Sequence, residues 1–176
     1  MYKRQEDYIA HPNTFLEKVV IQWEQAADAF QTAGVGLCKL RIGLVLTKEG
    51  GVLGPMKIPT SFGLGAAFGT GKQMQSWIHV DDLVALFLQA TAKGWEGIYN
   101  AVSPQPISQN DFAKTLSKDM RRPYFLPAVP SALIRLVAGE MSVLVFNSQQ
   151  VSAKKIQQKG FEFTYPDLLP AMQSLL

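Results

Sequence analysis

Cysteine and charge are both scarce in this chain, and each shortage excludes a class of protein. Cys38 is the single cysteine among 176 residues, which excludes an internal disulfide and most thiolate metal sites. It lies inside an apolar run, so we interpret it as a small core residue. Charged residues make up 18% of the sequence against 47% hydrophobic residues, a balance typical of a globular protein with a large interior.

Long apolar runs and basic clusters are also missing. No stretch of about 18 apolar residues occurs, and the N-terminus has no apolar signal segment, so we expect no membrane partner and a cytoplasmic location. The net charge is +3, and the basic residues form only pairs such as Arg121-Arg122 and Lys154-Lys155. A nucleic-acid-binding surface needs a basic stripe with aromatic residues between, so nucleic acid is not an expected partner.

The hydrophobic pattern alternates between helix and strand, which predicts an α/β fold. Thr14 and Glu17 form a capping box at the start of a helix that ends at Gly34. Its predicted buried stripe consists of Phe15, Val19, Trp23, Ala26 and Phe30. Val35–Leu46 is a nearly continuous apolar run, as expected for a strand that is covered on both faces in a parallel sheet.

Two more strands and several helices follow. Gln75–Val80 is a predicted strand that leads into a helix capped by Asp81 or Asp82, and Gly97–Val102 is another short strand. The buried residues of that helix are expected to be Leu83, Leu86, Phe87 and Ala90. Further helices are predicted from Ser108, capped with Asp111, to about Met120, from Pro130, over Ser152–Lys159, and from Pro166.

The stretch from Met56 to Met74 has poor periodicity and dense glycine. We predict a long, partly helical excursion over a ligand cleft, and we expect Pro55–Gln75 to be a mobile cover. Lys48–Pro55, just before it, reads as a loop because of its glycines and proline.

Three strings of sequence carry a family resemblance. They are QSWIHVDDLVALFLQA (75–90), GLGAAFGTGKQ (63–73) and QQVSAKKIQQKGFEFTYPDL (149–168). Together they resemble the epimerase-like branch of the extended short-chain dehydrogenases, which ends in a C-terminal domain of unknown function. The resemblance implies the C-terminal part of a Rossmann-like doubly wound parallel sheet plus a small, mainly helical substrate-side domain. No G-x-x-G-x-x-G turn occurs, so the N-terminal dinucleotide-binding half is expected to be missing.

The resemblance also divides the chain. Residues 14–122 are expected to be the remaining part of the Rossmann-like domain, and residues 123–176 the C-terminal domain of unknown function. Residues 1–13 are expected to be a loose N-terminus. Within them, residues 1–5 are polar and patternless, either as a flexible natural terminus or as a stretch encoded by a sequencing adapter.

By resemblance, the full-length protein would bind NADP or NAD and a small-molecule substrate such as a nucleotide sugar, as an epimerase or oxidoreductase. Such enzymes use a Tyr-x-x-x-Lys pair on the helix before the Val35 strand, where Lys18 here has Thr14 at the matching position. Two alternatives therefore stay open: a non-catalytic dinucleotide-binding sensor, and an interaction module that uses Lys154–Lys159. The chain itself is expected to be inactive and to bind dinucleotide weakly or not at all, because the glycine turn that cradles the pyrophosphate is absent.

His79 is the weak candidate for a catalytic residue. Its pKa is ordinarily near 6.5, which suits proton transfer, but its place in an apolar strand favours a buried, hydrogen-bonded histidine. No second histidine lies nearby, so no metal site is expected.

Arg41 needs an anionic or carbonyl partner because it lies within an apolar strand, and either a carboxylate clamp or a ligand would serve. The resemblance implies cofactor contacts by Arg41, Gly43, Leu44 and Val45. Substrate contacts are expected from Lys72, Gln73, Ser76 and Trp77.

Overall fold

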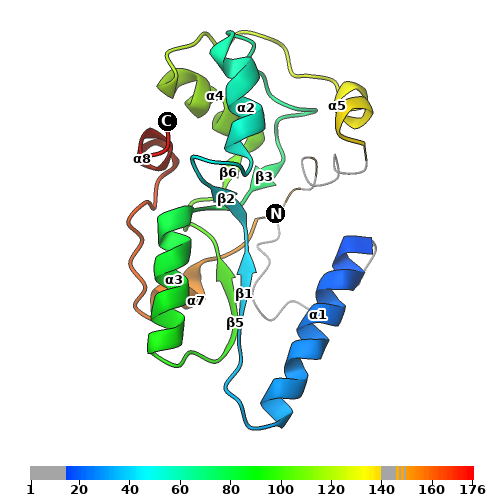
Figure 1. Ribbon diagram of the computed structural model, residues 1–176. Coiled ribbons are helices and arrows are strands. Elements are labelled where there is room, and N and C mark those ends of the chain that lie inside the picture. Colours follow the sequence, from blue (N-terminus) through cyan, green and yellow to red (C-terminus); the bar gives the residue numbers. More distant parts are fainter. Residues whose placement is uncertain (1–14, 140–145, 147, 149) are drawn as a thin grey trace.

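The computed structural model describes residues 15–139, 146, 148 and 150–176. Helices and parallel strand pairs alternate along it, which confirms the α/β fold class (Figure 1). In chain order the described elements are α1 (Phe15–Thr32), β1 (Cys38–Ile42), β2 (Leu44–Leu46), α2 (Leu53–Ser61), β3 (Met74–Gln75), β4 (Trp77–His79), α3 (Val80–Ala92), β5 (Gly97–Ala101), β6 (Ile107–Ser108), α4 (Gln109–Asp119), α5 (Ser131–Ala138), α7 (Lys154–Gln158) and α8 (Leu168–Gln173).

The apolar run that was expected to form one strand is divided at Gly43. β1 pairs in parallel with β5, and β2 pairs in parallel with β4. The N–H of Gly43 still donates to Ala101 O (3.2 Å), whereas the N–H of Leu44 donates to Ser76 O (2.9 Å). A Cβ at Gly43 would lie 2.5 Å from Ser76 O, so the two backbones can approach this closely only at a glycine.

α3 follows β4 without a linking loop. It covers one of the two hydrophobic cores, the cluster around Ile78 and Tyr99, which we call the lower core. Its N-cap is His79, whose side chain accepts the N–H of Asp81, so the expectation that Asp81 or Asp82 caps the helix was wrong. Leu86 and Ala90 are buried, as expected, in a core that Ile78, Tyr99, Ile156 and Phe161 share. Phe87 was also expected inside but is 47% exposed, because it lies on the outer face of the helix.

A second core lies in the upper lobe, where α2, α4 and α8 pack together beside the antiparallel pair β3–β6 (Figure 1). α2 begins at Leu53, inside the stretch expected to be loop. Leu53 and Met56 supply its buried face, so packing against α4 sustains a helix despite the neighbouring glycines and prolines. Ser108 caps α4 as expected, since its Oγ accepts the N–H of Asp111 (3.1 Å).

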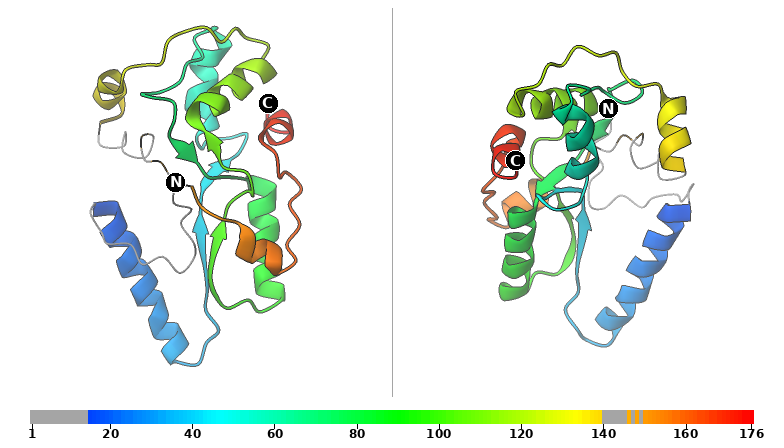
Figure 2. Two further views of the ribbon diagram at one scale, coloured as in Figure 1. Left: turned by 180° about the vertical axis from the view of Figure 1, so that it is seen from behind. Right: turned by 45° about the horizontal axis from the view of Figure 1, so that its top comes forward.

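α1 lies on the side of β1 opposite β5 (Figures 1 and 2). Three of its expected core residues are instead exposed: Trp23 at 71%, Phe30 at 61%, and Ala26. The prediction of a buried stripe was therefore wrong for the described residues, since no described element covers the side chains of Trp23 and Phe30. The capping box at Thr14 and the N-terminal stretch 1–13 lie outside the described residues.

The remaining predicted helices also form, with small shifts. α5 has Pro130 as its N-cap residue, and α7 ends before Gly160, whose φ of +73° suits glycine. The last helix starts at Leu168, two residues after Pro166. The C-terminal segment contributes to both cores, with Ile156 and Phe161 in the lower one and Met172 in the upper one.

Candidate functional site

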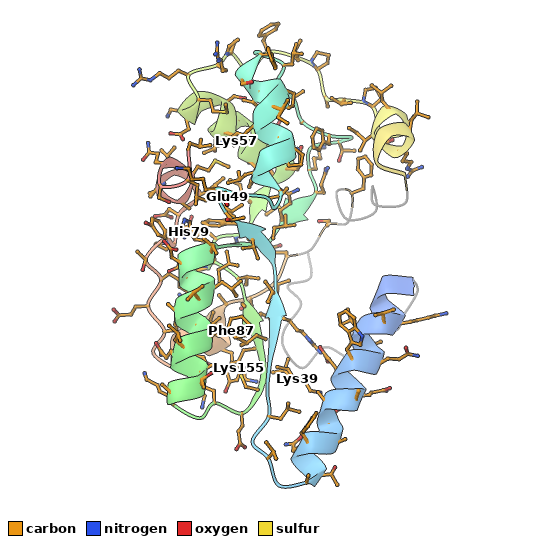
Figure 3. The ribbon with its side chains drawn as sticks, in the orientation of Figure 1. Lys39, Glu49, Lys57, His79, Phe87 and Lys155 are labelled. Atoms are coloured by element: carbon orange, nitrogen blue, oxygen red, sulfur yellow. The ribbon has the colours of Figure 1, made fainter. Side chains whose placement is uncertain are left out.

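The carboxyl ends of the parallel strands are the place to look for a ligand site in an α/β protein. β2 and β4 end together, because Leu46 pairs with His79. We call the segments 43–46 and 76–79, with the end of β5 at Ala101, the carboxyl edge. Figure 3 shows His79 at this level, at the upper end of α3.

The carboxyl edge brings together residues that were assigned to two separate groups. Leu44 pairs with Trp77, and the N–H of Leu44 donates to Ser76 O. Gly43 packs directly on the Ser76 carbonyl. The expected cofactor stretch Gly43, Leu44 and Val45 therefore adjoins two of the four expected substrate residues.

Several polar groups of this edge already have partners within the chain. Ser76 Oγ accepts the N–H of Val151 (3.0 Å). Trp77 is fully buried, and its Nε1 donates to Gln105 O (2.9 Å). The N–H groups of Gly43 and Leu44 belong to the sheet. These residues hold the edge together, and their contacts with a ligand stay predictions.

Arg41 lies on β1, two residues before Gly43, and forms a clamp with α1. Its Nε donates to Glu24 Oε1 (2.7 Å) and its Nη2 donates to Glu24 Oε2 (2.8 Å). The hydrogen bond from Arg41 lowers the pKa of Glu24 despite the opposing effect of burial. Of the two interpretations of Arg41, the structure shows the carboxylate clamp, while a cofactor contact remains a prediction.

Lys39 reinforces the same junction between α1 and β1. Its Nζ lies 2.5 Å from Asp28 Oδ1 and donates to Glu24 O (2.7 Å). Figure 3 labels Lys39 at this point, between the strand and the helix.

The other two expected substrate residues lie at the end of the glycine-rich loop, a few residues before the carboxyl edge in sequence but outside its parallel strand pairs. Lys72 is exposed. Gln73 is buried, its Nε2 donates to Phe68 O (2.8 Å), and its Oε1 accepts from Thr70 Oγ1 (3.4 Å). Gln73 therefore shapes the loop, and its contact with a substrate stays a prediction.

The loop itself is tied down rather than loose. Gly69 N–H donates to Val129 O (2.9 Å), Val129 N–H donates to Ala67 O (2.7 Å), and Phe68 N–H donates to Gln109 Oε1 (2.8 Å). Ala66 and Ala67 are buried. These bonds argue against a mobile cover, because hydrogen-bonded backbone opens less readily, and the mobility of the loop stays a prediction for hydrogen exchange to test.

His79 is a buried residue with partners on both ring nitrogens. It is 1% exposed, its Nδ1 accepts the N–H of Asp81 (3.1 Å), and its Nε2 lies 3.0 Å from Ser174 Oγ. The Tyr165 ring lies against it, with centroids 4.0 Å apart. Burial lowers the pKa of the ring, against the effect of Asp81 and Asp82. This is the buried, hydrogen-bonded histidine that the sequence favoured.

Sequence reasoning missed the role of Asp82. Its side chain is buried, and its two oxygens accept the N–H groups of Thr164 (2.7 Å) and Tyr165 (3.0 Å). A signal was present, because Asp82 stands four residues before Leu86 and therefore lies on the buried face of α3. The capping pattern by itself assigns Asp82 only to the helix start.

Gln75 and Gln109 were also overlooked. Both are buried, and Gln75 Oε1 and Gln109 Nε2 have no hydrogen-bond partner within the described residues. A polar residue next to an apolar strand was the available signal for Gln75. Nothing in the sequence pattern marked Gln109, which follows the cap of α4.

Two features are absent from the described residues. These residues contain no group of three or more His, Cys, Asp or Glu side chains that could hold a metal ion. Among the helices described, none has the length and apolar character needed to cross a membrane.

Comparison with known proteins agrees with the family resemblance. Residues 129–175 match a family described as a domain of unknown function, DUF1731. Over 172 residues the chain is 42% identical to an epimerase family protein of Staphylococcus saprophyticus and 38% identical to one of Staphylococcus aureus. Each match includes 97% of this chain and 57% of the relative, so the chain spans little more than half the length of these proteins.

Solved structures give the same result. A human epimerase family protein solved with NADPH superposes with a TM-score of 0.89 at 28% identity, over 99% of this chain and 59% of that protein. A nucleoside-diphosphate sugar epimerase of Corynebacterium glutamicum gives 0.77 at 27% identity, over 99% and 33% of the two chains. The resemblance to the epimerase-like branch of the short-chain dehydrogenases is thereby confirmed.

Proposed function

We propose that this chain, a relative of epimerase family proteins over nearly its whole length, is the C-terminal part of an NAD(P)-binding, epimerase- or oxidoreductase-like protein. The observation that carries the proposal is a pair of uncovered surfaces on one side of β1. Within the described residues β1 pairs only with β5, and α1 on its other side exposes Trp23 and Phe30. A further parallel strand with its helix would pair with that edge and cover those side chains.

The proposed protein divides dinucleotide binding between its two parts. In Rossmann-like folds the pyrophosphate rests on a glycine turn at a helix N-terminus, and no such turn occurs in this chain. The chain by itself therefore fits only part of a dinucleotide. We assign its cofactor contacts to Arg41 and 43–45 and its substrate contacts to Lys72, Gln73, Ser76 and Trp77. The substrate class is a nucleotide sugar or a similar small compound, and the location is the cytoplasm.

The domain division belongs to the same proposal. Residues 14–122 would continue the Rossmann-like domain, and residues 123–176 would form the C-terminal domain. The match to DUF1731 over 129–175 supports this boundary.

Trp23 offers a direct test of the proposed contact, because Trp77 and Trp95 are already buried. The chain should be co-expressed with the part of the S. saprophyticus relative that it does not cover. We expect a complex in which tryptophan emission moves to shorter wavelength, and the Trp23→Phe variant should form the complex without that shift. Failure to form a complex, or a shift that persists in Trp23→Phe, would contradict the proposal.

A non-catalytic sensor is the second candidate, and the sequence of α1 favours it. Lys18 is the lysine of this helix, and Thr14 stands four residues before it, so the helix lacks the tyrosine that transfers the proton in related enzymes. A sensor would bind NADPH in the reconstituted complex without consuming it. Steady oxidation of NADPH in the presence of a carbonyl compound would favour the enzyme instead.

An interaction module based on Lys154–Lys159 has less support. Lys155 Nζ donates to Ile98 O (2.7 Å) and lies 4.7 Å from the centroid of the Tyr99 ring, so this side chain is engaged within the chain. Lys154 and Lys159 remain exposed. A pull-down in which a partner is lost on substitution of these two lysines would revive this alternative.

A further inference from the structure

The last sixteen residues, 161–176, are held by hydrogen bonds with side chains far away in sequence. Asp82 accepts the N–H groups of Thr164 and Tyr165, and Ser103 Oγ donates to Pro166 O (2.7 Å). We call this segment the clasp. Figure 2 shows it running along α3 and ending in α8 beside the upper lobe.

A hydrogen bond between Ser174 and His79 holds the end of the clasp. His79 Nδ1 accepts the N–H of Asp81, so the neutral ring carries its proton on Nε2. Nε2–H then donates to Ser174 Oγ (3.0 Å), and the Ser174 hydroxyl donates to Ala171 O (2.8 Å). One tautomer of the neutral ring therefore satisfies all of these groups at once.

The charged and titratable groups around the ring come from two elements. From α3, Asp81 Oδ2 lies 3.6 Å from Nδ1, with its side chain 70% exposed, and Asp82 also acts on the ring. From the clasp, the Tyr165 ring stacks on it. Burial outweighs the two carboxylates and lowers the pKa of His79, so the native structure disfavours the charged ring.

Protonation would place a second donor against the N–H of Asp81. The Nδ1–H cannot accept that N–H, so α3 loses its cap. The charged ring can find an acceptor by turning toward the Asp81 carboxylate, and that rotation moves Nε2 away from Ser174. We propose that the clasp is a pH-dependent fastening of the C-terminus, closed by neutral His79 on Ser174 and opened by protonation of His79.

The sign of the pH effect follows from the geometry. Because the unfastened ring binds a proton more readily than the fastened one, closure is complete above the ordinary histidine pKa and is lost as the pH falls below it. Opening should increase by about tenfold for each pH unit below about 6.5, until the pH reaches the lowered pKa of the closed state. The proposal does not depend on cofactor binding and goes beyond the proposed function.

Hydrogen exchange of the 176-residue chain tests the proposal. Amide protection of Ala171, Ser174 and Leu175 should be measured by NMR from about pH 7.5 to about pH 5.5, corrected for intrinsic exchange, with the amide of Met120 at the end of α4 as internal reference. We expect protection of the three clasp amides to fall by about tenfold over this range, while that of Met120 stays constant.

Two variants distinguish a pH effect at the His79–Ser174 contact from a change in the overall stability of the chain. In His79→Asn the amide oxygen still caps α3 and cannot titrate in this range, so the pH dependence of the clasp should vanish. Ser108→Ala removes the cap of α4 and is the matched control, which should lower stability but keep that pH dependence. The proposal is overturned if the wild-type clasp shows no change with pH, or if His79→Asn opens with the same pH profile as the wild type.

Discussion

Gly43 is the residue on which the geometry of the carboxyl edge depends. Here the chain leaves β5 and pairs with β4, and it passes so close to Ser76 that a side chain has no space. The apolar run predicted a parallel strand but not this change of partner, and β1 is only partly buried, with Ile42 48% exposed. Nothing in a near-continuous apolar sequence distinguishes a glycine that only interrupts the pattern from one that permits two backbones to touch.

Substitution of Gly43 by alanine should be clearly destabilising. The new Cβ would meet Ser76 O at 2.5 Å and Val102 Cγ1 at 2.8 Å, and a backbone atom cannot move aside as a side chain can. We expect a loss of about 1–3 kcal/mol in the free energy of unfolding. Gly54→Ala in α2 is the control, since nothing lies within 4 Å of its Cβ position, and it should be neutral or slightly stabilising. Urea unfolding of both variants measures the difference, and equal stability would refute the steric account.

The Arg41–Glu24 clamp should give a small and pH-dependent contribution. The side chains are 33% and 23% exposed, so solvent screening limits the loss in Arg41→Ala to about 1 kcal/mol or less at neutral pH. Because the pKa of Glu24 is lowered, the contribution is present above its ordinary pKa and disappears as the pH falls through the lowered value. Urea unfolding at several pH values should therefore show the two proteins converging in acid, with Lys48→Ala, in an exposed loop, as control. A difference that grows toward acid would contradict this assignment.

At the scale of elements, sequence signals predicted an element correctly where the residues that stabilise it lie close together in sequence. The Ser108–Asp111 cap marked α4 correctly, because both groups lie within one helical turn. α2 could not be located in the same way. Its start at Leu53 depends on burial against α4, which lies more than fifty residues further along the chain.

The conformation of the glycine-rich loop was hard to predict for a related reason. Its glycines allow many backbone conformations, which suggested mobility, but hydrogen bonds to Gln109 and Val129 select one of them. Hydrogen-bond partners so far away in sequence produce no periodic pattern in the sequence of the loop. The candidate site was only partly predictable for the same reason: the resemblance located the carboxyl edge, while the partners of Ser76 and Gln73 came from the structure.

Gln109→Ala should release this loop. Removing Oε1 leaves the part-buried N–H of Phe68 without this acceptor, at a cost of about 1 kcal/mol. Hydrogen exchange of residues 66–71 should become faster in the variant and should be slow in the wild type. Gln105→Ala, an exposed position whose backbone carbonyl still accepts from Trp77, should leave the loop unchanged. Fast exchange of the loop in the wild type would restore the mobile cover that the sequence suggested.

At the scale of the whole molecule, two features lie on the side of β1 away from β5: within the described residues β1 has no strand partner there, and α1 exposes Trp23 and Phe30. The helical period predicted a buried stripe on α1, yet Trp23 and Phe30 are exposed within the described residues. Periodicity reveals which side chains are suited to burial, whereas the covering element can lie on residues outside the chain. The chain spans 57% of the length of the relatives it matches, and the covering of this surface by a further strand and helix remains part of the proposal.

Calorimetric titration with NADPH tests the central proposal most directly, on the chain alone and on its complex with the uncovered part of the S. saprophyticus relative. The chain alone should bind weakly or give no measurable heat, because it lacks the turn that cradles the pyrophosphate. The complex should bind NADPH at least about a hundredfold more tightly, a gain of about 2.7 kcal/mol. Sub-micromolar binding by the chain alone, or a complex that binds no better than the chain, would contradict the account.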